Sequence, residues 1–232
     1  MLKRALIGLI VLAAIGLGVF WWLTIPAGVA ATSLPAYQPD VANGQTMFNV
    51  GGCSSCHAVP NQPDRLKLGG GLAIPSPFGT FYAPNISPDP NDGIGRWSEA
   101  DFVTAVVKGS SPSGAHYYPA FPYASYQRAR IEDVRDLFAY LKTLAPAAGR
   151  VRDHDMPFPF NIRRTVGIWK LLFLDGEPFV ADSAHSPSWN RGAYLVNGLG
   201  HCAECHSPRN FLGGIVEAQR FAGGPNPEGE GW

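Results

Sequence analysis

The sequence is short of charge and of methionine. Lys, Arg, Asp and Glu make up 16% of its 232 residues, and 18 basic residues balance 18 acidic ones. Without a field of either sign, we expect no nucleic acid or other polyanion as a partner. No alternation of strands and helices is visible, and the abundant Gly (27) and Pro (21) disfavour a regular α/β sheet protein. This length allows one large or two small domains.

Cysteine is also scarce, and its four residues follow a strict pattern. They form two Cys-x-x-Cys pairs, each followed directly by His: CSSCH at 53–57 and CAECH at 202–206. This run is typical of c-type haem, because two thiols one helical turn apart can bond the porphyrin vinyl groups while the His ligates the iron. A four-thiolate zinc site would not need the histidines, and a disulfide seldom spans two residues. We predict two covalently bound haem c groups, held by Cys53, Cys56, Cys202 and Cys205, with His57 and His206 as axial iron ligands.

One apolar run is long enough to cross a membrane, and it lies near the N-terminus. Ala5–Ile25 carries no charge, and a stretch of about 20 helical residues spans the ~30 Å hydrocarbon core. Lys3 and Arg4 precede it, so this end should stay in the cytoplasm, with Trp21 and Trp22 at the outer interface.

The alternative for this run is a cleaved signal peptide, with a cleavage site at Gly28-Val29-Ala30. The apolar region of a signal peptide usually has about 7–15 residues, which is shorter than this run. We therefore predict a membrane anchor over 1–25 and a linker over 26–39. The rest of the chain would lie in the periplasm, attached to the inner (cytoplasmic) membrane.

Residues 40–145 carry the pattern of a haem domain. Asp40 can cap a helix over 41–50 that leads into CSSCH, and loops rich in Gly, Pro and Asn follow. A capping box at 98–101 opens a second helix. A last helix over 131–144 has one apolar stripe, formed by Val134, Leu137, Phe138 and Leu141. A helix before the motif, wrapping loops and a closing helix predict a class I cytochrome c domain.

Several stretches make the chain resemble the dihaem and trihaem cytochrome c subunits of bacterial membrane dehydrogenases of alcohols, sugars and sugar acids. They are GGCSSCH, PFGTFYAPNISPDPNDGIGRWSEADFV, HYYPAFPYASY and NRGAYLVNGLGHCAECHSPRN. The resemblance implies that electrons enter from a dehydrogenase subunit. It implies that they leave towards a quinone site, another cytochrome or an oxidase.

The family pattern also implies a Met as sixth iron ligand, in a Tyr-Pro-Ala-Met-Pro-Tyr setting, and here Phe121 stands at that place. Met47 is better explained as packing of the first helix, and Met156 as packing of the connector. His116 is the polar alternative as sixth ligand of the first haem; otherwise it is a surface histidine or contacts a haem propionate. Met ligation raises a haem potential, whereas bis-His ligation or an open position should lower it.

The second half of the chain is predicted as a connector over 146–186 and a second haem domain over 187–232. The connector holds a short apolar run over 166–174, which cannot span a bilayer. It either packs between the two haem domains or forms a docking surface for a partner subunit or the membrane. Residues 190–199 repeat the helix before the first motif, which indicates an internal duplication. Judged against the first copy, the second lacks its ligand loop and closing helix, so we expect it to be truncated.

We therefore predict an all-α fold with an N-terminal membrane anchor and two tandem cytochrome c-like domains, the second incomplete. The predicted function is that of a periplasmic, membrane-anchored dihaem cytochrome c. It would transfer electrons between a dehydrogenase and the respiratory chain without being an enzyme itself. The alternative is a haem enzyme or a small-ligand sensor that uses an open iron coordination position. No Arg–His pair typical of peroxide chemistry is evident in its favour.

Overall fold

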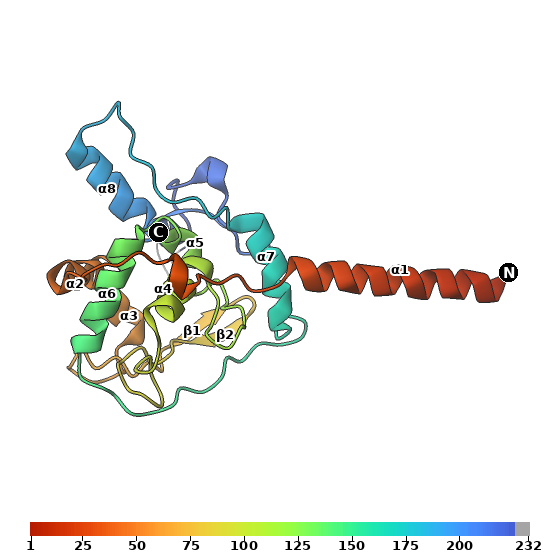
Figure 1. Cartoon of the computed structure of the whole chain (residues 1–232), viewed down its shortest axis with the longest axis horizontal. Helices are drawn as coiled ribbons and strands as arrows, with labels where there is room; N and C mark the ends of the chain where they lie inside the picture. The colour runs from red at the N-terminus through yellow and green to blue at the C-terminus, as the bar shows by residue number, and fades with distance from the viewer. Residues whose placement is uncertain (226–232) are drawn as a thin grey trace.

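A long helix projects from a globular body in the computed structural model, which describes residues 1–225 (Figure 1). This helix, α1 (Leu2–Leu23), has no buried residue. Among the described residues it alone is long and apolar enough to cross a membrane, with a mean hydropathy of 2.5. By length and composition it fits the predicted anchor, and a signal sequence near the N-terminus would fit the same measure.

The core of the body lies between three helices, α2 (Val41–Val50), α4 (Glu99–Lys108) and α6 (Ile131–Thr143). The predicted caps are present: Asp40 accepts hydrogen bonds from the first turn of α2, and Ser98 opens α4 through a complete capping box. All four residues of the predicted apolar stripe on α6 are buried. Local side-chain chemistry therefore determines where these helices begin and which face they bury.

Helices α2 and α6 cross at a glycine. A Cβ on Gly44 would overlap the carbonyl oxygen of Asp136, so no larger residue allows the two backbones this close. Next to the crossing, the Asn43 side-chain amide donates to the carboxylates of Asp133 and Asp136, at 2.7 Å each. Both aspartates are buried, and these bonds replace the water that they lose on folding.

The described residues are mostly helical, as predicted, and they also contain one small β-hairpin that the all-α prediction did not include. Strand β1 (Ala73–Ser76) pairs antiparallel with β2 (Gly79–Tyr82), and Thr80 also forms a bridge to Asp155 of the connector. The β2 sequence is Gly-Thr-Phe-Tyr, in which β-branched and aromatic residues favour an extended backbone. Phe81 is buried under it against Tyr118, in a second apolar cluster that Met156 also joins.

The predicted linker lies against the body as an ordered segment. It contains a short 3-10 helix, η1 (Ala31–Ser33). The Val29 amide donates to the Thr104 hydroxyl at 2.9 Å, and the Tyr37 hydroxyl donates to Asp136 at 2.9 Å. The path from α1 to α2 is therefore held by hydrogen bonds to α4 and α6.

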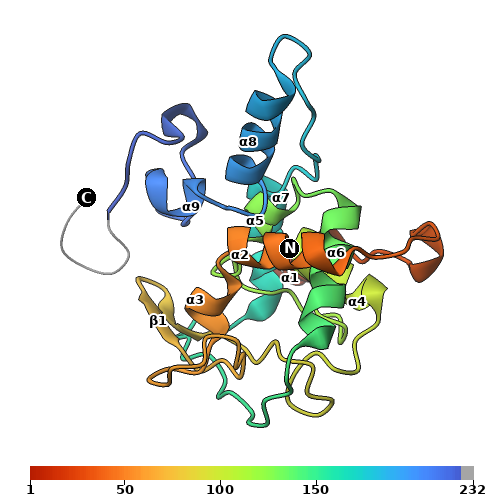
Figure 2. The same cartoon turned by 90° about the vertical axis from the view of Figure 1, so that its left-hand side faces the viewer.

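The remaining elements are short and surround the haem motifs and the connector. They are α3 (Cys53–His57), α5 (Tyr123–Tyr126), η2 (Arg163–Thr165), α7 (Val166–Phe173), α8 (Pro187–Asn197), α9 (Ala203–His206) and η3 (Glu217–Gln219). The pair α8–α9 repeats the order of α2–α3, as the duplication predicts. Figure 2 shows α9 beside α2 and α3. Residues 226–232 of the predicted second domain lie outside the described residues.

Candidate haem-binding sites

The first motif forms a helical turn with two free thiols. Cys53 and Cys56 lie one turn apart in α3, and none of the four cysteines is in a disulfide. Burial raises the pKa of the Cys53 thiol to about 12. Among residues 1–225, no group of three or more His, Cys, Asp or Glu side chains could hold a metal ion. The spacing of the two thiols, one helical turn, is the one that covalent attachment of haem needs.

The imidazole of His57 is oriented by a backbone carbonyl. Its Nδ1 donates to the Pro84 oxygen at 2.8 Å, which leaves the lone pair of Nε2 free for a metal. Burial lowers the pKa of His57, and the hydrogen bond to Pro84 partly opposes this. A neutral ring with a free Nε2 is the form that binds iron, so His57 fits the role of axial ligand.

A tight loop brings Pro84 to His57. The Gly70 amide donates to the His57 carbonyl at 2.8 Å, and Gly70 adopts a left-handed backbone with φ +71°. A Cβ there would lie 2.5 Å from the Pro84 carbonyl carbon. The loop therefore needs glycine at this position, both for its conformation and for its contact.

An aromatic cluster lies beside the first motif. The Phe121 ring packs against Tyr117, Tyr123 and Tyr126, with ring centroids 5.6–6.3 Å apart. Burial raises the pKa of Tyr126 well above its ordinary value, and the nearby Cys53 and Cys56 thiols add to the rise. Phe121 is thus one ring away from the cysteines, and its own side chain offers no polar atom to iron.

The structure places His116 at the end of α1. It is 3% exposed, and its Nε2 donates to the Thr24 carbonyl at 2.8 Å. Its Nδ1 has no hydrogen-bond partner among the described residues. Burial lowers the pKa of His116, and the Lys170 and Arg164 charges lower it further. Ligation of iron by His116 stays a prediction, and in this arrangement it would have to use Nδ1.

The two methionines of the body are packed among apolar side chains. Met47 is fully buried on α2 within the core between the helices, as predicted. Met156 joins the cluster under the hairpin and does not lie in the core that contacts Cys53. Both therefore have packing roles, in line with the interpretation from the sequence.

The second motif is more exposed than the first. Cys205 and His206 are both exposed, and the His206 ring makes no hydrogen bond within residues 1–225. Glu204, inside the motif, is bound from two sides: the Ser125 hydroxyl and the Arg209 guanidinium each donate to its carboxylate at 2.6 Å. Burial raises the pKa of Cys205, the Arg209 charge opposes this, and Glu204 adds to it.

The two motifs lie next to each other. The His201 Nε2, just before the second motif, donates to the Gly51 carbonyl, just before the first, at 3.2 Å. A Cβ on Gly51 would lie 3.4 Å from the Cys53 sulfur and 3.5 Å from the Leu199 carbonyl oxygen. The Cys56 thiol is near enough to Cys205 to help raise its pKa. The sequence did not predict this contact or the Ser125–Glu204 bond, because no local pattern links residues so far apart.

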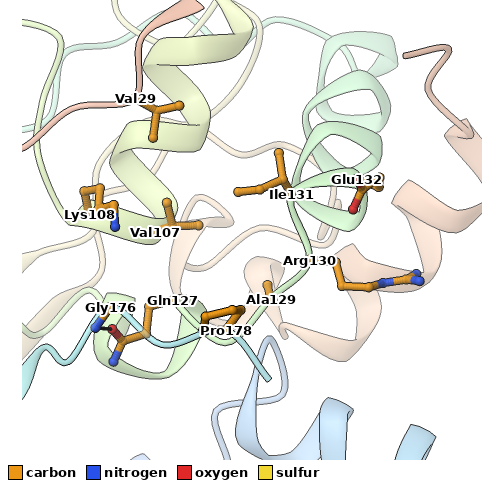
Figure 3. A pocket seen from close by; sticks show the side chains of 10 residues that line it. All are labelled: Val29, Val107, Lys108, Gln127, Ala129, Arg130, Ile131, Glu132, Gly176 and Pro178. Carbon is orange, nitrogen blue, oxygen red and sulfur yellow. Dashed lines mark hydrogen bonds between the residues drawn. The ribbon is translucent and has the colours of Figure 1, made fainter. Parts of the chain in front are cut away.

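A cavity of about 310 Å³ lies away from both motifs (Figure 3). It lies between α4, α6 and the connector, and two of its lining residues are joined by a hydrogen bond of 2.6 Å from the Gly176 amide to the Gln127 side chain. No Cys or His lines it. Since no haem ligand faces this cavity, it is not a haem site.

The residues of both motifs fit haem c, with two thiols and one imidazole in each. Comparison with known proteins supports this fit. Residues 41–145 match the family model described as cytochrome c. The chain is 44% identical over 232 residues to a protein named "Diheme cytochrome c-type" from Cereibacter sphaeroides, a match that covers 99% of this chain and 78% of that protein.

Two dehydrogenase subunits are also similar. The "Fructose dehydrogenase cytochrome subunit" of Gluconobacter japonicus is 42% identical over 78% of this chain, and the "Alcohol dehydrogenase (quinone), cytochrome c subunit" of Gluconobacter oxydans is 38% identical over 88%. The matches span 37% and 44% of those two proteins, so the chain covers less than half of their length. On these matches and on the geometry of its two Cys-x-x-Cys-His motifs, the chain belongs to the cytochrome c family.

Proposed function

We propose that this chain is a membrane-anchored dihaem cytochrome c that passes single electrons from a dehydrogenase partner to the respiratory chain. The observation that carries the proposal is the contact between the two motifs, through the His201–Gly51 hydrogen bond. Haem c bound at each motif supplies a one-electron couple, Fe(III)/Fe(II). The chain's own residues supply attachment, through the four cysteines, and axial ligation, through His57 and His206.

Contacts at the end of α1 support a retained anchor. Thr24 is 1% exposed, and its carbonyl and hydroxyl accept hydrogen bonds from His116 and Arg164 at 2.8 Å each. Cleavage at residues 28–30 would remove Thr24 and leave both of these groups without that partner. The cost of an unmade buried hydrogen bond is about 1–3 kcal/mol. With the basic end of α1 in the cytoplasm, the haem motifs lie on the periplasmic side of the inner membrane.

The haem count tests the cofactor part of the proposal. The full chain, produced with a c-type maturation system, should give two haems per chain in a pyridine haemochrome assay, and both should stay attached in denaturing gels. Cys53→Ala/Cys56→Ala and Cys202→Ala/Cys205→Ala should each give one. A wild-type chain with one haem or none would contradict a dihaem protein.

Reduction by a partner tests the electron-transfer part. The two relatives described above are named as cytochrome subunits of a fructose and of an alcohol dehydrogenase, so these classes are the first donors to try. Addition of such a dehydrogenase with its substrate should reduce both haems, and a quinone or an oxidised cytochrome should reoxidise them. Failure with every donor, together with turnover of a small molecule at the haem, would contradict the proposal.

One observation favours the alternative of a ligand-binding haem. Phe121 stands at the Met position of the family pattern, surrounded by tyrosine rings. Rapid binding of carbon monoxide by the reduced first haem would show an open coordination position there. A redox titration of His116→Ala beside the wild type would show whether His116 fills that position, since loss of a ligand changes the spectrum and the potential.

A further inference from the structure

Helix α7 has two unlike faces. Val166, Gly167 and Lys170 are buried against the body. Ile168, Leu171 and Leu172 share the opposite face, because residues three and four apart lie on one side of a helix. They are 37%, 56% and 60% exposed, so the described residues leave a large part of three apolar side chains uncovered. We call these three residues the α7 face.

The start of α7 is packed against the end of α1. A Cβ on Gly167 would lie 2.5 Å from the Cβ of Thr24, the residue that ends α1. Arg164, just before α7, donates to the Trp21 carbonyl at 2.6 Å, and its guanidinium stacks on the Trp21 ring at 4.1 Å. Thus α7 lies at the level of Trp21, and tryptophan side chains typically mark the membrane–water interface.

The orientation of α7 matches this level. Figure 1 shows α7 running across the inner end of α1, on the flank of the body from which α1 projects. If α1 follows the membrane normal, α7 lies along the membrane plane. Its buried face packs on the body and on Thr24 at the end of α1, and the α7 face lies on the other side of the helix.

The contacts inside the body keep α7 in this position. The Lys170 amine donates to the carbonyls of Lys108 and Gly109, at 2.6 Å each, at the C-terminal end of α4. The Trp169 indole donates to the Leu212 carbonyl at 3.0 Å, in the segment after the second motif. Helix α7 is thereby tied to the end of α1, to the first haem domain and to the segment that follows the second motif.

We propose that the α7 face is inserted into the outer leaflet of the membrane, at the boundary between headgroups and acyl chains. This inference rests on the proposed anchor, because α1 places the bilayer there. A helix with one apolar face that lies in the interface plane buries this face about 5–10 Å deep. The body would then be fixed at two points and could not swing about the end of α1, so the haem motifs keep one height above the membrane.

Spin labelling of the full-chain holoprotein tests this inference. The native cysteines are consumed as thioethers, so an introduced cysteine is the one free thiol, which unlabelled wild type confirms. Leu172→Cys reports on the α7 face, Leu17→Cys on the centre of α1, and Val41→Cys on α2 at the far side of the body; all three side chains are exposed. Each labelled protein is placed in vesicles of phosphatidylethanolamine and phosphatidylglycerol. Collisions of the label with oxygen, which dissolves in lipid, are compared with those of a water-soluble nickel chelate.

We expect the oxygen-to-nickel collision ratio at Leu172→Cys to be several-fold above that at Val41→Cys and below that at Leu17→Cys. A ratio equal to that of Val41→Cys, while Leu17→Cys reports hydrocarbon, would overturn the inference and leave the anchor intact. A water-like ratio at Leu17→Cys would overturn the anchor and the inference together. Protection of Leu172→Cys that appears only after a dehydrogenase is added would show a protein interface instead of a lipid one.

Discussion

At the residue scale, the orientation of His57, the predicted axial ligand, depends on one backbone carbonyl, and Gly70 allows the loop that brings this carbonyl to it. Gly70→Ala places a Cβ against Ala83 and Pro84, which should push the Pro84 oxygen away from His57 Nδ1. A weaker hydrogen bond makes the imidazole a poorer donor to Fe(III), so the potential of the first haem should rise. A net hydrogen bond of about 1 kcal/mol corresponds to roughly 40 mV for one electron. Spectroelectrochemical titration measures this shift.

Gly71→Ala is the matched control for this substitution. Gly71 also has a positive φ, +104°, but a Cβ there would come no nearer than 3.8 Å to another residue, at Pro60. Both variants carry the backbone strain of a left-handed alanine, about 1–3 kcal/mol. If the potential of the first haem rises equally in the two variants, the backbone strain, and not the weaker His57–Pro84 hydrogen bond, causes the rise.

Phe121 is a second residue at which a single substitution should change the potential of the first haem. Phe121→Met restores the side chain that the family pattern has at this position, within reach of the tyrosine cluster beside Cys53 and Cys56. Thioether ligation favours Fe(II), so we expect the potential of the first haem to rise and binding of carbon monoxide to slow. Phe121→Leu, which offers no ligand, should do neither. The same potential in both variants would mean that the loop does not bring residue 121 to the iron.

At the scale of elements, the two helices that precede the haem motifs, α2 and α8, differ in what packs against them. Gly44 of α2 touches the backbone of α6, whereas nothing described lies within 4 Å of the Cβ position of Gly192 in α8. Gly44→Ala should therefore destabilise the fold by about 2 kcal/mol or more through overpacking. Gly192→Ala should stabilise it by up to about 1 kcal/mol, because alanine is the better helix former. Thermal unfolding of both variants in detergent measures these opposite changes in stability. A loss of stability in both variants would mean that the face of α8 at Gly192 is not open.

Several helices were predictable because their signals are local. The caps at Asp40 and Ser98 and the apolar period of 131–144 lie within a few residues of the structure that they specify. The hairpin was not predicted, because four-residue strands carry too short a pattern and Phe81 is buried largely by residues distant in sequence, Tyr118 and Val166. The same limit applies to the sites. The spacing within each motif predicts its cofactor, whereas the His201–Gly51 contact joins residues 150 positions apart and depends on the finished fold.

Helix α7 should make stability depend on pH through Lys170. Burial lowers the pKa of this lysine from 10.5 to about 7. Between these values the unfolded chain binds more protons than the folded one, so the free energy of unfolding rises as pH increases from about 7 towards 10.5. Each unit of pKa difference corresponds to about 1.4 kcal/mol. Lys170→Met should flatten this rise, whereas Leu171→Met, on the exposed side of α7, should keep it. If the melting temperature of Lys170→Met depends on pH in the same way as that of the wild type, Lys170 does not lose its proton in the folded protein over this pH range.

At the scale of the whole molecule, three side-chain hydrogen bonds join the region of the second motif to the first domain, beside the buried Leu199. The Tyr194 hydroxyl of α8 donates to Asp133 of α6 at 2.5 Å, the Ser125 hydroxyl donates to Glu204, and His201 donates to Gly51. Two of these three bonds end on a carboxylate, and a hydrogen bond to a charged group contributes about 1.5–3 kcal/mol. The relative placement of the motifs therefore depends on these polar side chains as well as on the packing of Leu199 and Leu195 against the core.

A double-mutant cycle on Ser125 and Glu204 tests this dependence. Ser125→Ala and Glu204→Gln should each lower the stability of the second motif region, and the double variant should lose less than the sum, by about 0.5–3 kcal/mol. Glu204→Gln should also raise the potential of the second haem, because the side chain is 11% exposed and its negative charge favours Fe(III). Glu217→Gln, whose side chain is 71% exposed, is the control and should leave the potential nearly unchanged.

If electrons cross between the motifs at this contact, Ser125→Ala should slow equilibration between the two haems after a flash reduction while leaving the haem count at the wild-type value. Additive losses of stability together with unchanged equilibration would mean that this bond does not position the second haem against the first.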